Sequence, residues 1–375
     1  MRQKKFLIKK IVKQLNYAIN LESFKKFGFP SILPSNVLIA TTYMCNSRCR
    51  TCNVWKKYNL SEKKPKDEMT FDEFTEFVNK NDFLIKIALT GGEPFLRNDL
   101  HDMIIFLDQK GYNTEITTNA ILTDKIKLEE SKILNDLSGN IPHNLSISID
   151  GLEKTHDYLR GIKGNFKRAI NLLKWSIQQT KKYDSFTTSI SHNITQSNYI
   201  EFPQFFDYFV NFGLKPQQIT FRVAQLSSHY FENIESDEIP MNFSQINGQI
   251  KKILNKYEIL KSDTYYQGLI RYLNNPYKQV FPCSVCFSFC YIDPYWNVFP
   301  CMSWAKNLGN LRDFDFNLKK FWESGSVKNT RELIKNEKCP NCWTQCTSIP
   351  TITANIFVLP KRYYNLLKYI KIFRR

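Results

Sequence analysis

Short apolar runs alternate with amphipathic segments along residues 37–224. Apolar runs of about four to eight residues, rich in β-branched side chains, are typical of strands buried on both faces. Segments whose apolar positions recur about three or four residues apart are typical of helices that cover such strands. The pattern predicts six strands, at Val37–Thr42, Leu84–Thr90, Asn113–Thr118, Asn144–Asp150, Phe186–Asn193 and Ile219–Ala224.

Polar residues at the ends of the amphipathic segments indicate where helices begin and end. Thr70 and Glu73 form a capping box ahead of one helix, and Gly111 follows the end of another. Strands that alternate with helices form a parallel sheet with right-handed crossovers, and active sites of such folds form among the loops after the strands. Further helices are predicted at Asp99–Lys110, Asp124–Leu137, Asn165–Lys182 and about residues 199–212.

The pattern changes after residue 227. The following stretch is rich in acidic residues, Tyr and Asn, with one predicted helix at Phe243–Tyr257, and the stretch after that contains seven of the ten cysteines. We therefore predict five parts: a basic N-terminal helical segment (1–35), an α/β domain (36–227), a connecting region (228–280), a small cysteine-rich domain (281–350) and a basic C-terminal tail (351–375).

The net charge of +17 is concentrated at the two ends of the chain. Residues 1–30 carry a net charge of +7 and residues 361–375 carry +6, which leaves little excess around the predicted active edge. We therefore expect no nucleic-acid partner. The spacing of apolar and basic residues at both ends predicts amphipathic helices. These helices either dock on the protein or lie on an anionic membrane surface. No apolar run approaches the roughly 18 residues of a membrane span, so we expect a cytoplasmic protein, with the membrane surface as a second location.

Three cysteines directly after the first predicted strand carry the strongest chemical signal. Cys45, Cys49 and Cys52 follow the spacing C-x3-C-x2-C. Three thiolates on one loop can hold three corners of a cubane iron–sulfur cluster and leave the fourth iron open for a cofactor or substrate. There are two alternatives. One is three unrelated buried thiols, and the other is a zinc knuckle, although zinc prefers four ligands and no fourth Cys or His lies near this loop in the sequence.

A second loop strengthens this interpretation. Gly91, Gly92, Glu93 and Pro94 follow the second predicted strand, and the two glycines let the backbone approach a ligand closely. With both motifs at the same edge, the chain resembles the radical S-adenosylmethionine enzymes. The resemblance implies a partial (β/α)6 barrel of the TIM type. It also implies a [4Fe–4S] cluster on the three cysteines, whose open iron binds S-adenosylmethionine, and contact between the Gly-Gly-Glu-Pro loop and the amino group of that cofactor.

The resemblance extends to further residues of the same region. It implies cofactor contacts at Thr118 and Asn119 after the third strand, at Ser148 in the fourth strand, and at Arg160 near the methionine carboxylate. One position departs from the family pattern, because Thr51 stands where an aromatic residue usually precedes the third cysteine.

The cysteine-rich region resembles the SPASM or twitch extension of this family, which holds auxiliary [4Fe–4S] clusters. Trp296 stands where the extension's pattern has a glycine. Seven cysteines suit one or two auxiliary clusters; we favour at least one, formed by Cys301, Cys339, Cys342 and one of three others, and a structural zinc site is the alternative. The candidate ligands are Cys283, Cys286, Cys290, Cys301, Cys339, Cys342 and Cys346.

The resemblance implies reductive cleavage of S-adenosylmethionine and abstraction of a substrate hydrogen, in a net oxidation or cross-link of a peptide or a saccharide. It also implies an electron donor such as flavodoxin or ferredoxin. The alternative is a non-catalytic iron–sulfur or zinc protein that carries electrons or binds a partner, although an electron carrier has no need of a cofactor-binding loop. We assign no catalytic residue: the five histidines are scattered, and Asp150 is equally suited to a helix cap or a cofactor contact.

Overall fold

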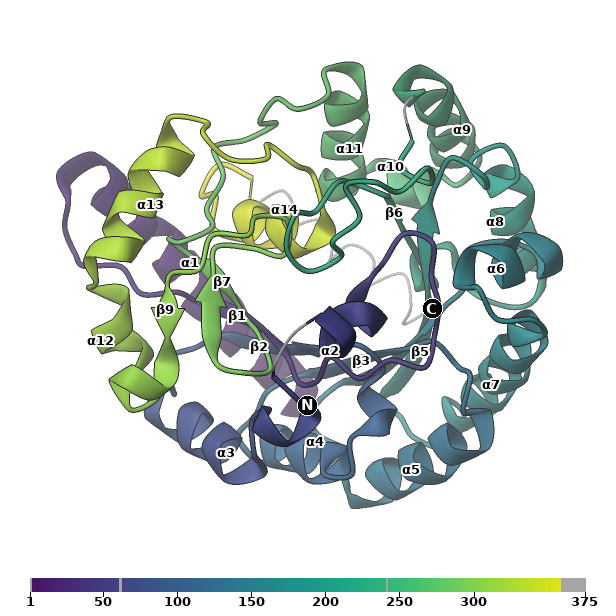
Figure 1. Ribbon diagram of the computed structural model, residues 1–375, viewed down its shortest axis with the longest axis horizontal. Helices are drawn as coiled ribbons and strands as arrows, with labels where there is room; N and C mark the ends of the chain where they lie inside the picture. Colours follow the sequence, from purple (N-terminus) through teal and green to yellow (C-terminus); the bar gives the residue numbers. More distant parts are fainter. Residues whose placement is uncertain (1, 61–62, 241, 359–375) are drawn as a thin grey trace.

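The computed structural model describes residues 2–60, 63–240 and 242–358. In these residues the chain forms an open ring of parallel strands with helices around its outside, as Figure 1 shows. All six predicted strands are present within a residue or two of their expected bounds. They are β1 (Asn36–Ala40), β2 (Lys86–Thr90), β3 (Thr114–Thr118), β4 (His143–Ser148), β5 (Phe186–Ile194) and β6 (Ile219–Val223).

The strands belong to two hydrogen-bonded sheets. One has the order β3-β4-β5-β6 and the other the order β2-β1-β7-β8-β9, in which β7 (Phe289–Ile292) pairs parallel with β1. The short strands β8 (Asn297–Phe299) and β9 (Gly309–Asn310) continue this sheet as antiparallel neighbours. The α/β partial barrel is therefore present, and the sequence boundary at residue 281 falls just before a strand that extends the barrel wall.

The structure contains the helices predicted between the strands and several others. The Thr70–Glu73 capping box is formed, with the Glu73 amide 3.2 Å from Thr70 Oγ1. The helices up to the end of the barrel are α1 (Arg2–Phe27), α2 (Lys57–Leu60), α3 (Phe71–Lys80), α4 (Leu100–Gln109), α5 (Thr123–Asp136), α6 (Glu153–Arg160), α7 (Asn165–Gln179) and α8 (Phe202–Asn211). The later helices are α9 (Phe243–Lys256), α10 (Glu258–Lys261), α11 (Thr264–Asn274), α12 (Leu318–Trp322), α13 (Gly325–Lys335) and α14 (Gln345–Thr353). Helices α3, α4, α5, α7 and α8 agree with the prediction, whereas α2 and α6, which also lie between strands, were not predicted, and several later helices add to the set.

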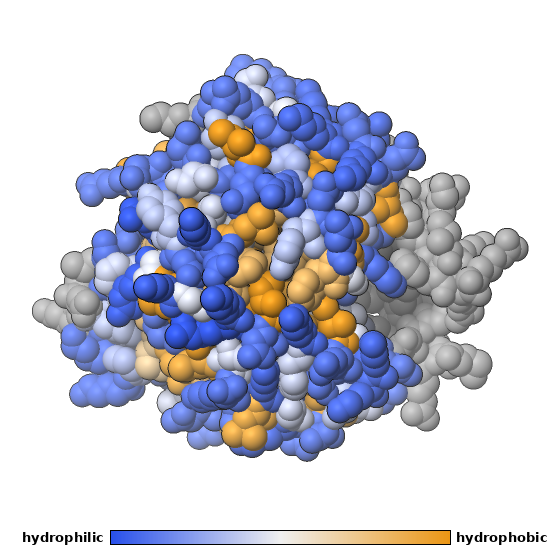
Figure 2. Space-filling view, turned by 90° about the vertical axis from the view of Figure 1, so that its right-hand side faces the viewer, coloured by the Kyte–Doolittle hydropathy of each residue, from blue (hydrophilic) through white to orange (hydrophobic). Residues whose placement is uncertain are grey.

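The described residues form two large hydrophobic cores, and a small third cluster packs α1 against Phe287. Ile219, Phe221 and Val223 of β6 pack against α8, whose Phe205 and Phe209 are fully buried. The second core lies around β1 and the later sheet. On the face at the right of Figure 1, which Figure 2 shows, most side chains are hydrophilic and apolar side chains gather near the centre of the face.

The turn between β7 and β8 accommodates a tryptophan in a left-handed conformation. Trp296 has a φ of 67° and is completely buried, with its ring 5.2 Å from that of Phe77 and 5.0 Å from that of Phe316. A positive φ favours glycine, so the burial of this large ring offsets the backbone cost at a position where the sequence pattern leads us to expect glycine.

The basic N-terminal segment docks on the protein. In α1, Gln14 Nε2 donates to the Thr353 carbonyl oxygen at 3.1 Å, and the Tyr17 hydroxyl donates to the Leu33 and Phe287 carbonyl oxygens. The predicted basic helix at residues 361–375 lies outside the described residues, so membrane contact through the two ends stays a prediction. Within the described part of the chain, no helix has the length and apolar character needed to cross a membrane.

Candidate functional site

The loops after β1 and β2 interlock at the carboxyl ends of the strands. The first loop carries the three predicted cluster ligands and the second is Gly91–Pro94. A Cβ atom on Gly92 would lie 2.0 Å from the Met44 carbonyl oxygen and 3.0 Å from Cβ of Cys45. The Gly92 amide donates to the Thr42 carbonyl oxygen at 2.7 Å. Gly92 therefore serves first to let this loop lie directly on the cysteine loop, a packing role that sequence reasoning did not give it.

Glu93 ties the second loop to the end of β3. Its carboxylate accepts hydrogen bonds from Thr118 Oγ1 at 2.9 Å and from the Asn119 amide at 2.7 Å. The Asn119 side chain in turn donates to Asn46 Oδ1 at 2.8 Å, and its Nδ2 lies 3.9 Å from Cys45 Sγ. Burial raises the pKa of Glu93 to about 7 even though these hydrogen bonds favour its charged form. Glu93, Thr118 and Asn119, three of the predicted cofactor residues, thus form one hydrogen-bonded network that extends to Cys45.

Arg160, at the end of α6, lies against the middle cysteine. Its Nη1 donates to Cys49 Sγ at 3.2 Å, and its Nε lies 3.1 Å from Asp150 Oδ2. Its carbonyl oxygen accepts from Ser47 Oγ and from the Arg48 amide, each at 3.1 Å. The side chain of Arg160 therefore places a positive charge beside the thiol, and its backbone fixes the cysteine loop.

The end of β4 supplies the remaining predicted residues of the site. Burial alone would raise the pKa of Asp150, but the Arg160 guanidinium holds it below its usual value. Ser148 is buried near the same strand end, where it pairs with Ser191 of β5. Asp150 therefore stays charged as the partner of Arg160, and Ser148 lies at the same edge as the cysteine loop.

Residues 228–238, which the sequence assigned to a connecting region, pack on the site. The buried Tyr230 hydroxyl donates to the Gly91 carbonyl oxygen. Asn233 Nδ2 donates to the Thr51 carbonyl oxygen at 3.0 Å. Nothing in the local sequence pattern signals these contacts, because they depend on how the chain returns over the barrel.

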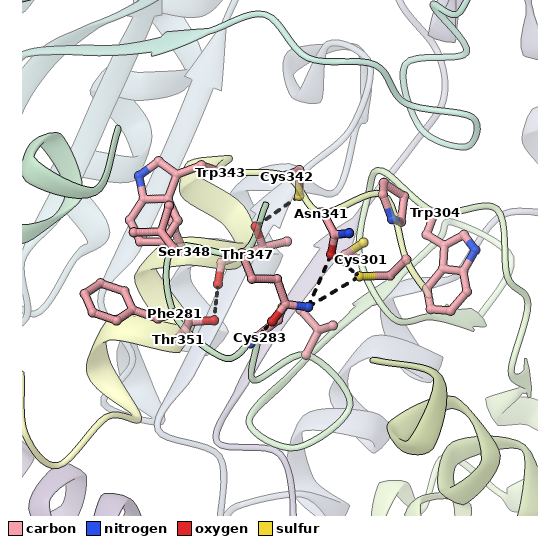
Figure 3. Close-up of a pocket in the computed structure, with 15 residues that line it drawn as sticks. Phe281, Cys283, Cys301, Trp304, Asn341, Cys342, Trp343, Thr347, Ser348 and Thr351 are labelled. Carbon is pink, nitrogen blue, oxygen red and sulfur yellow. Dashed lines mark hydrogen bonds between the residues drawn. The ribbon is translucent and has the colours of Figure 1, made fainter. Parts of the chain in front are cut away.

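Four of the seven C-terminal cysteines line one pocket, shown in Figure 3. Cys283, Cys301, Cys339 and Cys342 come from three separate stretches of chain and surround a small cavity of about 30 Å³. Gln279 Nε2 lies 3.9 Å from Cys339 Sγ. The pocket is lined by Cys301, Cys339 and Cys342, which the sequence favours as ligands, and by Cys283, one of the three alternatives for the fourth. The wall of the pocket also includes Phe281, Trp304, Asn341, Trp343, Thr347, Ser348 and Thr351.

The other three predicted ligands lie outside this pocket. Cys286 and Cys290 are fully buried; Cys290 belongs to β7, and the carbonyl oxygen of Cys286 accepts from Arg331 Nε at 2.8 Å. Cys346 is the second residue of α14. The structure therefore divides the ten cysteines into a group of three, a group of four and three that join neither group.

The thiol groups fit iron–sulfur clusters better than a single ion. In residues 2–60, 63–240 and 242–358, no three His, Cys, Asp or Glu side chains converge closely enough to hold one metal ion. Each thiolate of a cubane binds a different iron, so cluster ligands stand farther apart than the ligands of one zinc ion. Burial raises the pKa of Cys45 and of Cys283 to about 12. Because metal ligation needs thiolates, cluster insertion must release their protons.

Comparison with known proteins identifies the region around the three cysteines. Residues 39–209 match the family model of the Radical SAM superfamily. The AdoMet-dependent heme synthase of Methanosarcina barkeri is 25% identical over 302 residues, which cover 76% of this chain and 80% of that protein. The sporulation killing factor maturation protein SkfB of Bacillus subtilis is 31% identical over 146 residues, which cover 38% of this chain and 33% of that protein.

The fold is similar to that of SuiB of Streptococcus suis, a protein of known structure. SuiB of Streptococcus suis bound to S-adenosylmethionine aligns with a TM-score of 0.61 and 15% identity, over 84% of this chain and 71% of that one. The structure of SuiB bound to its precursor peptide SuiA aligns with a TM-score of 0.58 and 16% identity, over 83% and 69% of the two chains. At these identities the likeness concerns the fold, and it includes the cysteine-rich part of the chain.

Proposed function

Because this chain is a radical SAM enzyme, which uses a [4Fe–4S] cluster together with S-adenosylmethionine, we propose that it modifies a peptide by a net oxidation or a radical cross-link. In this proposal Cys45, Cys49 and Cys52 hold the cofactor-binding cluster. Cys283, Cys301, Cys339 and Cys342 would hold an auxiliary cluster whose irons are all ligated by the protein.

When bound, the cluster and S-adenosylmethionine supply a 5′-deoxyadenosyl radical that abstracts a hydrogen atom from the substrate. The chain's own residues prepare the place where this happens. Arg160 balances the negative charge of the thiolate at Cys49. Glu93, fixed by Thr118 and Asn119, offers a carboxylate at the same edge for an ammonium group of the cofactor.

Three buried tyrosines pack together beside the cysteine loop. The ring of Tyr230 lies 6.4 Å from that of Tyr43 and 5.7 Å from that of Tyr291. The Tyr43 and Tyr291 hydroxyl oxygens are 3.3 Å apart, so these polar groups partner each other rather than solvent. A dry wall of this kind suits radical chemistry, because it limits side reactions with solvent.

The interlocking of Gly91–Pro94 with the cysteine loop is the observation that carries the proposal. A protein that only transfers electrons has no need to build this loop, with its buried carboxylate, against the ligands. The peptide substrate is supported by two relatives, since SkfB is named for the maturation of a killing factor and SuiB has been solved with a precursor peptide.

A second candidate substrate is a heme precursor. The match to the heme synthase of Methanosarcina barkeri covers 76% of this chain, more than the match to SkfB. Peptide and heme chemistry are separated by incubating the enzyme with each class and searching the products by mass spectrometry.

The decisive test of the enzyme proposal is anaerobic reconstitution of the full chain, followed by dithionite and S-adenosylmethionine. We expect 5′-deoxyadenosine and methionine to form, and we expect the triple variant Cys45→Ala, Cys49→Ala, Cys52→Ala to form neither. If a chain with an intact cluster spectrum produces no 5′-deoxyadenosine, the proposal fails.

A further inference from the structure

The inside of the barrel is lined by polar side chains. Successive side chains of a strand point to opposite faces, so every second residue of β4, β5 and β6 points away from the surrounding helices and into the ring of strands. The outward residues, such as Phe221, belong to the core that packs against α8. The inward residues of these strands include Ser146, Ser148, Ser189, Ser191, Thr220 and Arg222. An interior of this composition suits a polar ligand.

Arg222 brings a positive charge into this interior. Its side chain is half-buried, and its Nη1 donates to Ser191 Oγ at 2.8 Å. Among the described residues this is the one hydrogen bond of the guanidinium, and no carboxylate lies within 4.0 Å of its nitrogens. A guanidinium has five N–H donors in a planar fork that matches a carboxylate, so most of them remain available to a ligand.

The other charges of the barrel interior do not neutralise Arg222. Lys86 and Glu115 occupy inward positions near the amino ends of β2 and β3, and their opposite charges offset each other. Asp150, at the end of β4, is engaged by Arg160. A partly buried cation without a carboxylate partner loses solvation free energy, and the binding of an anion offsets that loss.

The position of Arg222 in the sheet is level with the cofactor site. Arg222 pairs with Asn193 of β5, and the Asn193 amide donates to Asp150 Oδ1 at 2.7 Å. Asp150 is the partner of Arg160, which donates to Cys49 Sγ. A ligand on Arg222 would therefore lie inside the barrel, at the edge where the three-cysteine loop lies.

Unpartnered polar atoms lie at the same end of β6. Gln225 follows β6 and is tied to the cysteine loop, because Asn233 Nδ2 donates to the Gln225 carbonyl oxygen at 3.2 Å and to the Thr51 carbonyl oxygen at 3.0 Å. The Gln225 Nε2 atom is buried and has no hydrogen-bond partner in the part of the chain that the structure describes. The same holds for the hydroxyl of Tyr265, a residue of α11 that is only 2% exposed.

Tyr265 and Cys346 lie close enough to Arg222 for its charge to act on them. Burial raises the pKa of the Tyr265 hydroxyl and of the Cys346 thiol, and the Arg222 guanidinium opposes both rises. The helix α11 packs against β6 through Tyr266, whose ring stacks on that of Phe221 with 4.2 Å between the centres. The guanidinium therefore has neutral hydroxyl and thiol groups as neighbours, and these can donate hydrogen bonds to an anion.

We propose that Arg222, oriented by Ser191, is a specificity-determining residue that binds a carboxylate of the substrate inside the barrel. The inference deepens the proposed function and rests on it, since the substrate must lie where the 5′-deoxyadenosyl radical forms. An acidic side chain of a peptide and an acidic side chain of a heme precursor present the same group. A bidentate hydrogen bond from the guanidinium to that group would fix how the substrate lies beside the cofactor.

The test measures binding to the reconstituted full chain in the presence of S-adenosylmethionine and without a reductant, so that no turnover occurs. The peptide probes are the acetylated and amidated sequence Ala-Ala-Glu-Ala-Ala and its counterpart with Gln in place of Glu. The heme-precursor probes are coproporphyrin III and its full methyl ester, which has no free carboxylate. Equilibrium dialysis gives the dissociation constant of each probe.

We expect the protein to bind the acid of one pair at least about tenfold more tightly than its neutral counterpart. Arg222→Gln should abolish this preference, and Arg222→Lys should retain part of it, because lysine keeps the charge but not the planar fork. The matched control, Arg271→Gln, removes an exposed arginine of α11 and should keep the full preference. A preference in the peptide pair assigns the carboxylate to a peptide, and one in the porphyrin pair assigns it to a heme precursor.

Three results would overturn the proposal. The first is that the unaltered protein does not prefer the acid in either pair. The second is an acid preference that survives Arg222→Gln. The third is a loss of affinity for S-adenosylmethionine in that variant at full iron content, which would assign Arg222 to the cofactor instead of the substrate.

A second variant covers the case in which Arg222→Gln fails to fold or to hold iron. Ser191→Ala removes the hydroxyl that orients the guanidinium, so it should weaken the binding of the acid and leave that of the neutral probe unchanged. An undiminished acid preference in Ser191→Ala would contradict the proposal. An acid preference that depends on Arg222, in a chain that forms no 5′-deoxyadenosine with dithionite, would reject the proposed function and leave this carboxylate site standing.

Discussion

The two groups of cysteines in this chain are built in opposite ways. Cys45, Cys49 and Cys52 lie on a single loop, and their neighbours are charged or polar groups such as Arg160. The second group comes from three separate stretches and is enclosed by aromatic and amide side chains. Three thiols on one segment leave one iron of a cubane cluster without a protein ligand, so a cofactor can bind to it. Four thiols from several segments ligate every iron and link those segments to one another. In the proposed function, the first group of cysteines forms the site for chemistry and the second group forms a site for electron storage or structure.

We call the group Cys283, Cys301, Cys339 and Cys342 the closed site. Removal of two of its four cysteines should give the largest change in iron content. We expect Cys301→Ala with Cys342→Ala to lower the iron content by about four atoms per chain, because a whole cluster loses its support. Formation of 5′-deoxyadenosine with dithionite should persist, since the three-cysteine loop is untouched. The control is Cys346→Ala, which lies outside the pocket and should keep its iron. Equal iron loss in both variants would place Cys346 among the ligands and break the grouping.

We call the loop with Cys45, Cys49 and Cys52 the open site. A substitution outside these three cysteines should also prevent cluster binding there. In Gly92→Ala the new methyl group would lie 2.0 Å from the Met44 carbonyl oxygen, a backbone atom that cannot move cheaply. We expect the free energy of unfolding to fall by about 2–3 kcal/mol and the cysteine loop to lose its cluster. The control, Gly248→Ala, meets no atom within 4 Å in α9 and should raise stability by about 0.5–1 kcal/mol. Denaturant titration and iron analysis measure both effects; a Gly92→Ala chain with full iron would contradict the packing role.

The closed site has a corresponding glycine. A Cβ atom on Gly268 of α11 would lie 2.0 Å from Cζ2 of Trp343, the residue after Cys342. We expect Gly268→Ala to shift that tryptophan, to cost about 1–3 kcal/mol of stability and to lower the auxiliary iron. Cleavage of S-adenosylmethionine should continue. Loss of cleavage with full iron would show that the two sites are not separable in this way.

Arg160 tests the charge that distinguishes the open site. In Arg160→Gln the Cys49 thiolate loses its cation and Asp150 is left buried without its partner. We expect the affinity for S-adenosylmethionine to fall about 10–100-fold, as measured by equilibrium binding to the reconstituted enzyme. Arg168→Gln, which removes an exposed arginine, should bind the cofactor normally. Equal affinities in the two variants would remove Arg160 from the cofactor site.

The sequence is informative where its signals are local. The period of the apolar residues predicted the strands β1 to β6, and the spacing of Cys45, Cys49 and Cys52 defined one site. Pairings between distant segments carry no such signal. The short run Phe289–Ile292 gives no indication that β7 pairs with β1, and nothing near Tyr230 predicts its contact with Gly91.

The choice among the later cysteines also depends on tertiary structure. The sequence leaves Cys283, Cys286 and Cys290 open as alternatives for the fourth ligand. The fold separates them because Cys290 is part of β7 and Cys286 lies in the left-handed turn before that strand, with a φ of 61°, whereas Cys283 faces the pocket. Trp296 shows a related limit, since its large ring occupies a left-handed turn that a local rule reserves for glycine.

The central claim is that the chain holds two separate iron–sulfur sites, one open and one closed. It is tested most directly by counting iron and sulfide in the anaerobically reconstituted triple variant Cys45→Ala, Cys49→Ala, Cys52→Ala. The account predicts that this variant keeps about four irons per chain and forms no 5′-deoxyadenosine. An iron content near zero would contradict the closed site, and an iron content equal to that of the unaltered protein would contradict the open one.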